Sequence, residues 1–261
     1  MFRRLLRLAT ACGTCLATSG EAGAACTRAT LQGVIDRYIA SQAMGDPQSL
    51  PILANAPYIE QNRAAVLQKG ILAQPMKVEF SHSLLDVRQC QTFTELAVVD
   101  PAHPYVIGTQ LAVDEDVITA MRTLVAGATN GPVDADNWVR RISKEDWGVL
   151  PREQRVDRAT LIAAADAYLD ALNDPGTAVP WGTPCRRLEA GAISGTGADD
   201  DRCDIGRPQG VKATDRSYVV DEQLGAVAAL VSVGHPAQGG SYLLRLVDGR
   251  IRLVHVLSAA R

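Results

Sequence analysis

The sequence lacks the short motifs that identify several large enzyme classes. It contains no GxSxG nucleophile elbow, no P-loop, no GxGxxG dinucleotide fingerprint and no HExxH helix. Each of these motifs holds a nucleophile, a phosphate or a zinc ion in a defined backbone setting. Their absence argues against serine hydrolase, nucleotide-dependent and zinc-protease chemistry.

Positive charge is scarce and dispersed. The 26 Lys and Arg residues are outnumbered by 29 Asp and Glu residues, and the net charge is −3. Proteins bind nucleic-acid backbones through clustered positive charge, so we expect no nucleic-acid partner. The 47% of hydrophobic residues is ordinary for a globular protein with one or two cores.

The first 25 residues predict an export signal. Arg3, Arg4 and Arg7 give a positive start, residues 8–17 form a mildly apolar run, and small residues precede Cys26. The apolar run is too short for a membrane span. We therefore predict cleavage before Cys26 and a secreted or periplasmic protein that is free of the membrane afterwards. An unstructured N-terminus and a lipoprotein acylated at Cys26 are the alternatives.

The chain carries an internal repeat. The segment Arg28–Leu31 recurs as Arg158–Leu161, 130 positions later. Further matches follow: Asp36 with Asp166, Tyr38 with Tyr168, and Asp46-Pro47 with Asp174-Pro175. Such self-similarity predicts one small fold used twice. We divide the mature chain into a first repeat of residues 26–137, a connector of residues 138–155 and a second repeat of residues 156–261.

The cysteines predict two disulfides. Cleavage of the signal leaves Cys26, Cys90, Cys185 and Cys203, an even number in an exported chain. Of the three possible pairings we favour Cys26–Cys90 and Cys185–Cys203, because each bridge then stays inside one repeat. Free thiols are the alternative. No CxxC pair lies in the mature chain, so we expect no zinc site.

Each repeat is expected to open with an amphipathic helix and to end in strands. Apolar residues recur at helical spacing after Thr27 and Asp157, which are suitable N-caps. Alternating residues and turn signals predict strands near 58–60, 78–84, 92–99, 105–113 and 117–124, and near 187–189, 218–221, 226–233, 242–247 and 251–257. Several strands are apolar on both faces, which favours sheets covered on each side. A second helix near residues 63–69 and a loop over residues 127–137 are also expected.

The order of these elements resembles the SnoaL-like branch of the nuclear-transport-factor-type cone fold. A helix, a short extended segment and a meander ending in a turn such as Val247-Asp248-Gly249-Arg250 carry this resemblance over nearly all of residues 26–261. The segments YVIGTQ (105–110) and VPWGTPC (179–185) are similar to a family of secreted, uncharacterised proteins common in fungi.

The resemblance implies an α+β fold of two tandem cone-shaped α+β barrels. In each barrel, helices pack on a curved antiparallel sheet, and the two barrels form a pseudo-dimer. The fold also implies an apolar pocket in each cone. Many members use that pocket for cofactor-free acid–base chemistry. Ketosteroid isomerase is such a cone, and there the environment of each carboxyl group sets its pKa. Other members only bind ligands or form dimers.

Five residues are candidates for acid–base chemistry. Glu60 and Glu189 lie at matching places in the two repeats, and a partly buried carboxyl can acquire a pKa suited to proton transfer. Tyr38 could donate a hydrogen bond to a developing oxyanion. His82 and His255 share strand faces with apolar residues, where an imidazole could act as a base. The structural alternatives are a solvated Glu, a packed Tyr and a hydrogen-bonded core His.

Five further residues are candidates for substrate contacts. Tyr58 and Tyr168 could place hydroxyl groups in a pocket, and Arg187 could hold a carboxylate. Trp147 and Trp181 could stack on a sugar or an aromatic ring, or could instead cover the seam between the repeats.

Two functions follow from these residues. The first is a cofactor-independent acid–base enzyme, a lyase, isomerase or hydrolase, acting on a small organic or sugar-derived substrate. The second is a non-catalytic extracellular protein that binds a small ligand. In both cases we expect a small-molecule partner, no metal and no cofactor. We also expect a monomer that is itself a pseudo-dimer, with further homo-oligomers left open.

Overall fold

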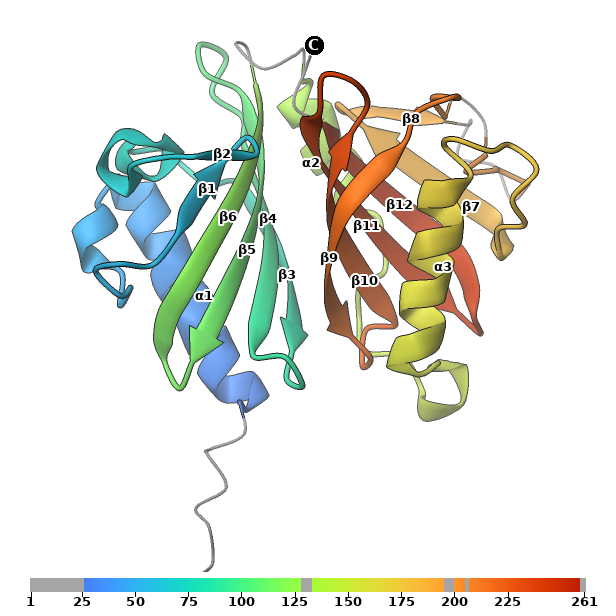
Figure 1. The fold of residues 1–261 in the computed structure, drawn as a ribbon, viewed down its shortest axis with the longest axis horizontal. Helices are drawn as coiled ribbons and strands as arrows, with labels where there is room; N and C mark the ends of the chain where they lie inside the picture. The colour runs from blue at the N-terminus through green and yellow to red at the C-terminus, as the bar shows by residue number, and fades with distance from the viewer. Residues whose placement is uncertain (1–25, 128–132, 195–199, 205–206, 259–261) are drawn as a thin grey trace, which may run out of the picture.

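Two six-stranded sheets face each other in this computed structural model, and helices cover their outer faces (Figure 1). The structure describes residues 26–127, 133–194, 200–204 and 207–258. The predicted export signal, residues 1–25, lies outside these ranges. The protein is α+β, with two mixed sheets and few helices. Within the described ranges, no helix is long and apolar enough to cross a membrane.

The first half begins with helix α1 (Arg28–Met44). Thr27 caps the helix as predicted, because its side chain accepts a hydrogen bond from the Thr30 N–H at 3.0 Å. The helix ends at Gly45, whose φ of 65° lies in the left-handed region that favours glycine. The strands that follow are β1 (Tyr58–Glu60), β2 (Arg63–Ala64), β3 (Phe80–Asp86), β4 (Gln91–Val98), β5 (Tyr105–Asp114) and β6 (Val117–Gly127).

The prediction of a helix near residues 63–69 is wrong. Residues 63–64 form β2, and only a 3-10 turn, η2 (Leu67–Lys69), follows before Gly70. Another short turn, η3 (Ile71–Ala73), comes next. A helix this short needs tertiary packing to offset the cost of nucleation, and residues 63–66 are exposed.

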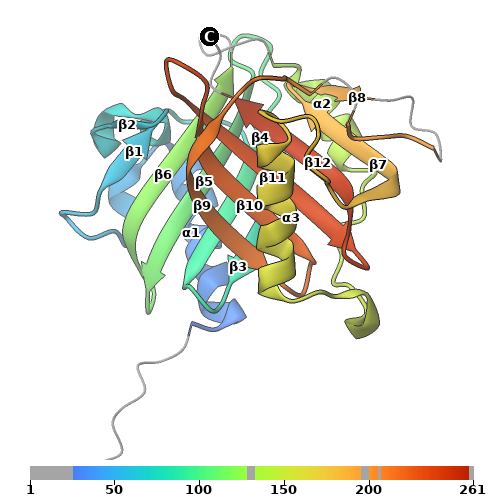
Figure 2. The same cartoon turned by 45° about the vertical axis from the view of Figure 1, so that its right-hand side comes forward.

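The second half repeats the plan. Helix α3 (Arg158–Asp170) starts at Asp157, whose carboxylate accepts from the Thr160 N–H at 2.8 Å, again as predicted. Figure 2 shows this helix lying along the outer face of the second sheet. The strands are β7 (Trp181–Glu189), β8 (Ala192–Ser194), β9 (Ala213–Asp221), β10 (Ala226–Val233), β11 (Gln238–Val247) and β12 (Arg250–Ser258).

Strand order and register agree between the halves. The orders are β2-β1-β6-β5-β4-β3 and β8-β7-β12-β11-β10-β9. Glu60 lies opposite Thr123, and Glu189 lies opposite Val256, at the same step of the two sheets. The expected antiparallel sheets are in fact mixed, because β1 runs parallel to β6 and β7 runs parallel to β12.

Both faces of each sheet are buried, as the apolar strands predicted. One face packs on its helix, with Tyr38 of α1 and Tyr168 of α3 fully buried there. The opposite faces pack on each other, and a cluster that includes Phe93 of β4 and Leu243 of β11 fills this contact. We call the contact between the two sheets the seam. Burying one large apolar side chain stabilises the fold by about 1.5–3 kcal/mol.

A helix that was not predicted spans the end of the expected loop (residues 127–137) and the start of the connector (residues 138–155). Helix α2 (Ala135–Ile142) starts at Asp134, whose carboxylate accepts from the Asn137 N–H at 2.8 Å. Its apolar face, with Trp138 and Ile142, is buried in the seam. The spacing of these residues after an N-cap was a readable helix signal. A 3-10 turn, η4 (Arg152–Gln154), precedes α3.

Two disulfides confirm the favoured pairing. Cys26 joins Cys90, 64 positions away, and Cys185 joins Cys203, 18 positions away. Closing loops of this size stabilises a fold by roughly 3–4 kcal/mol in the chain-entropy model. Disulfides persist in oxidising compartments, so these bridges are compatible with an extracellular protein.

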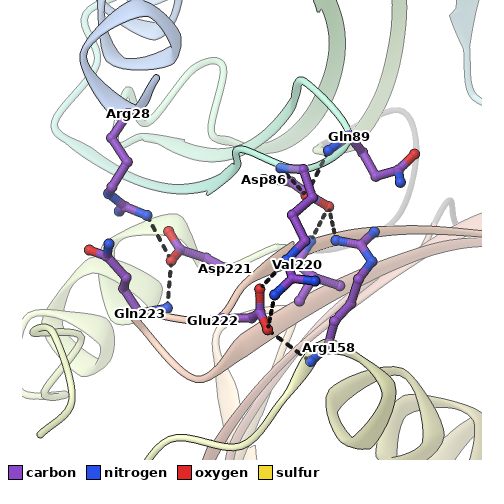
Figure 3. A network of polar contacts seen from close by, with 9 residues as sticks. Arg28, Asp86, Gln89, Arg158, Val220, Asp221, Glu222 and Gln223 are labelled. Carbon is purple, nitrogen blue, oxygen red and sulfur yellow. Dashed lines mark hydrogen bonds and ion pairs between the residues drawn. The ribbon is translucent and has the colours of Figure 1, made fainter. Parts of the chain in front are cut away.

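Reciprocal ion pairs join the halves at one end of the seam (Figure 3). Asp86, at the end of β3, is buried. Its Oδ2 atom accepts from the Arg158 guanidinium at 2.6 Å and from the Val220 N–H at 2.9 Å, both in the second half. A buried carboxylate needs such partners, because unpaired burial of a charge is costly.

Asp221, at the end of β9, makes the mirrored set of contacts. Its carboxylate accepts from the Arg28 guanidinium at 2.9 Å and from the Leu85 N–H at 3.1 Å, both in the first half. The two arginines begin the repeated segments found in the sequence. The repeat therefore preserves a contact between the halves as well as a helix start, in the manner of a self-complementary two-fold interface.

Candidate functional site

A carboxylate–tyrosine pair lies at the surface of the first half. Glu60 is the last residue of β1, and its Oε2 atom accepts from the Tyr58 hydroxyl and from the Ile71 N–H at 2.8 Å. Tyr58 is buried and Glu60 is half-buried. Burial, together with the bond to Glu60, raises the pKa of Tyr58, so the phenol stays protonated and remains a donor.

Two adjoining pockets of about 430 Å³ flank this pair. Tyr58 lines the first pocket, whose wall is otherwise mostly apolar. Glu60 and Lys69 line the second. Both pockets include Ala65 and Val66 in their walls, so they are neighbours on one surface. A pair of polar groups beside an apolar hollow is the usual composition of a small-molecule site.

Tyr38 lines neither of these pockets. It is fully buried between α1 and the first sheet, and its hydroxyl donates to Thr109 Oγ1 at 2.7 Å. Thr109 in turn contacts Thr123 Oγ1 at 3.1 Å. Burial raises the pKa of Tyr38, although the Thr109 bond opposes the shift. The phenol is therefore a neutral, hydrogen-bonded member of the core.

The equivalent region of the second half has a different charge balance. Arg187 is only 4% exposed; its Nε donates to the Tyr168 hydroxyl at 3.1 Å and its Nη2 donates to Glu189. The Trp181 ring lies 5.8 Å from the Tyr168 ring, and the Arg207 guanidinium lies 5.3 Å over Trp181. Glu189 is thus neutralised by a cation, whereas Glu60 is held by neutral donors.

A second constellation lies in the seam. His255 of β12 is fully buried, and its Nδ1 contacts Glu95 Oε2 of β4 at 2.7 Å. Its Nε2 contacts Glu145 Oε2 of the connector at 2.8 Å. The side chains of Glu95 and Glu145 are 2% and 5% exposed. One imidazole therefore joins the first half, the connector and the second half.

Electrostatics make this imidazole a cation. Burial alone lowers the pKa of His255, but the carboxylates of Glu95 and Glu145 outweigh burial and raise it to about 10. His82 lies nearby without a carboxylate partner. Its burial, with the positive charges of His255 and Arg245, lowers its pKa to about 3. At neutral pH the structure thus pairs a charged His255 with a neutral His82.

Aromatic rings enclose the two histidines. The Trp147 ring lies 4.3 Å from His82 and 5.2 Å from His255, and its Nε1 donates to Glu145 at 2.9 Å. Trp138 meets His255 edge-on at 5.4 Å. Of the two roles considered for Trp147, the structure places it in the seam.

The structure divides the predicted catalytic residues between separate sites. His82 lies opposite Glu95 in the β3–β4 pair, on the seam face, whereas Tyr38 contacts the helix-side face. Side chains alternate between faces along a strand, so the apolar face that His82 shares is the contact between sheets. His255 likewise lies on the sheet face opposite to Glu189, although their strands pair at neighbouring positions, His255 with Leu188 and Val256 with Glu189.

Sequence reasoning missed Glu95, Glu145 and Arg245. Glu95 and Arg245 each interrupt an apolar strand, and both are buried. A charged residue inside a strand that is apolar on both faces was therefore the available signal for the seam. Within the described residues, no group of three His, Cys, Asp or Glu side chains is arranged to hold a metal ion.

Comparison with known proteins adds one match. Residues 154–258 match a family described as a domain of unknown function (DUF8021). The match spans α3 to β12 and so covers the second half of the chain. Neither the curated proteins nor the solved structures contain a match to this chain.

Proposed function

We propose that this protein is an exported, tandem SnoaL-like protein whose first half performs cofactor-independent acid–base chemistry on a small organic or sugar-derived molecule. The shared strand order, the helix on the outer face of each sheet and the reciprocal Asp86 and Asp221 contacts support two related cones arranged as a pseudo-dimer. The disulfides support export. Glu60 is the proposed base.

The geometry of the Glu60 carboxylate carries this proposal. Both of its donors, Tyr58 and Ile71, reach the same oxygen, Oε2. Within the described residues Oε1 accepts no hydrogen bond, so it is the atom that would take a substrate proton. Neutral donors orient the carboxylate without cancelling its charge, which suits a base. Lys69 in the same pocket wall would stabilise an oxyanion or enolate formed beside it.

Deuterium exchange offers the sharpest test of the base. A thermal-shift panel of lactones, aromatic acids and sugars identifies compounds that bind, and each is then incubated with the protein in D₂O. We expect exchange at an acidic C–H bond, and Glu60→Gln should slow it by about 10²–10⁴-fold while binding persists. The exposed Glu153 provides a matched Glu→Gln control. Equal exchange rates for the wild type and Glu60→Gln would refute the role of Glu60.

Ligand binding without catalysis is the second candidate, and the second half favours it. Arg187 already neutralises Glu189, and the Arg207 guanidinium lies over the Trp181 ring beside it, a cation–aromatic pair of the kind that recognises planar ligands. If this function holds, Trp181→Ala should weaken a panel compound that the protein binds but does not turn over. Loss of turnover in Glu189→Gln would contradict it.

A further inference from the structure

A groove beside the seam is distinct from the pockets at Glu60. It has a volume of about 390 Å³ and lies between the connector and strands β7, β11 and β12. Its cationic lining residues are Lys144, Arg186, Arg245 and Arg252, and its acidic ones are Glu145 and Asp146. Positive side chains thus outnumber negative ones here, although the whole chain carries a net charge of −3. A positive recess on a negative protein attracts anions locally.

The buried cation of this groove is Arg245. The residue is 3% exposed, and its Nη2 donates to the Gly148 carbonyl at 2.9 Å. Its Nη1 is also buried and makes no hydrogen bond to any residue that the structure describes. Within the described ranges, the carboxylate that forms an ion pair with Nη1 is Asp146, whose Oδ1 lies 3.8 Å away on a side chain that is 88% exposed. A buried charge with an unused donor is costly unless a ligand completes its hydrogen bonds.

The acidic residue on the inner wall does not compete for that donor. Glu145 Oε2 is already bonded to His255 Nε2 and to Trp147 Nε1. The imidazolium therefore offsets the Glu145 charge, and the Trp147 ring supports Arg245 from the other side at 5.7 Å. The guanidinium is held rigidly at the groove, which lowers the entropy cost of binding an anion.

Most of the remaining lining is apolar. Apart from Gln154, it consists of Leu150, Pro184, Val247 and Leu253, which form a hydrophobic wall next to the cation. Arg252 stands in the same lining, with its Nε bonded to the Pro184 carbonyl at 2.8 Å. We propose that this groove binds a small organic carboxylate, with the carboxylate on Arg245 and Arg252 and the apolar body against Leu150 and Leu253.

Benzoate is a suitable first probe, with benzamide as its neutral counterpart and inorganic phosphate as an anion without an apolar body. Isothermal titration should show benzoate binding to the wild-type protein at millimolar concentrations or below. Benzamide and phosphate should each bind at least about tenfold more weakly, because each lacks one of the two contacts. Phosphate binding as tight as that of benzoate would indicate a simple ion site and would overturn the proposal.

Two variants locate the site. Arg245→Lys keeps the charge but loses the forked guanidinium, and it should weaken benzoate by about tenfold. Arg252→Gln, at the groove, should weaken benzoate several-fold even if Arg245→Lys fails to fold. Arg250→Gln removes the same charge from an exposed residue on the same strand, outside the groove, and should have no effect.

The outcomes are distinct from those at Glu60. Glu60→Gln should leave benzoate affinity at the groove unchanged. The proposal for the groove and the proposal for Glu60 as a base can therefore fail independently of each other. Absence of benzoate binding at millimolar concentrations would overturn the groove proposal. Equal benzoate affinities of Arg252→Gln and Arg250→Gln would overturn it as well.

Discussion

The buried imidazole of His255 is expected to stabilise the fold in a pH-dependent way. Its pKa rises from an ordinary 6.5 to about 10 because Glu95 and Glu145 flank it in the seam. Each tenfold change in proton affinity corresponds to about 1.4 kcal/mol. Full loss of the charged His255 would therefore cost on the order of 4–5 kcal/mol. Removing one partner from a buried ion pair costs about 3–5 kcal/mol, which is consistent with this figure.

The direction of the pH effect follows from the raised pKa. Below pH 6.5 both the folded and the unfolded chain hold the proton on His255, so the stabilisation is fully present. Above pH 6.5 the unfolded chain loses the proton first. The free energy of unfolding should then fall by up to about 1.4 kcal/mol per pH unit until the pH reaches about 10.

Urea denaturation at several pH values between 6 and 9 measures this slope. The wild-type free energy of unfolding should decline steadily above pH 6.5, whereas His255→Gln should be less stable at pH 6 and nearly independent of pH up to 9. His103, exposed in the turn between β4 and β5, supplies a control, because His103→Gln should keep the wild-type slope. If the free energy of unfolding changes with pH equally in the wild type and in His255→Gln, a charged His255 imidazole does not stabilise the seam.

Three further outcomes are expected. Asp86→Asn and Asp221→Asn should each cost about 1.5–3 kcal/mol in urea denaturation, because each replaces a buried carboxylate that accepts hydrogen bonds from a partly exposed arginine and from backbone N–H groups of the other half. Losses below about 0.5 kcal/mol would contradict the reciprocal pairing. The free energy of unfolding should fall as the pH drops from 6.5 to 5, because the unfolded chain binds a proton at His82 that the folded chain, with its lowered His82 pKa, does not bind. His82→Gln should therefore show a smaller loss of stability over this range. An equal loss in the wild type and in His82→Gln would contradict this explanation. Replacing Cys26 and Cys90 by Ser should lower stability by about 3–4 kcal/mol, and a reducing agent should then have little further effect through this bridge.

Much of the fold could be predicted because its signals are local. Thr27 and Asp157 satisfy N–H groups within their own first turns, so each helix start is visible in a few residues. Strand alternation gave most strand positions, and the internal repeat led to the correct cysteine pairing. The helix prediction for residues 63–69 failed because residues 63–66 are exposed and only Leu67 packs on the core, so nothing offsets the cost of helix nucleation there. The parallel pairing of β1 with β6 depends on contacts between distant residues and has no local signal.

The candidate sites were harder to predict because they depend on which face a side chain occupies. His82 and Tyr38 both lie among apolar residues, yet a sheet separates them. Sequence spacing reports the alternation of faces but does not say which face meets a helix and which meets another sheet. Glu95 and Glu145 acquire their role only when the connector folds into the seam beside β12.

Differences between the two halves indicate where a specific function has developed. His255, which lies opposite Leu188, corresponds in register to Arg122, which lies opposite Ile59. Arg122 donates to the Asn62 side-chain carbonyl oxygen at 2.6 Å. His255, by contrast, contacts two buried carboxylates, those of Glu95 and Glu145.

The connector accounts for this difference. It brings Glu145 and Trp147 to one side of the seam only, where they complete the His255 cluster and form part of the groove at Arg245. Arg245 corresponds to Ala112, since each precedes the β-bulge of its hairpin. The first half therefore has no counterpart of this cation. If the groove serves recognition, replacing Arg245 should affect binding, whereas Ala112→Ser at the equivalent place should leave it unchanged.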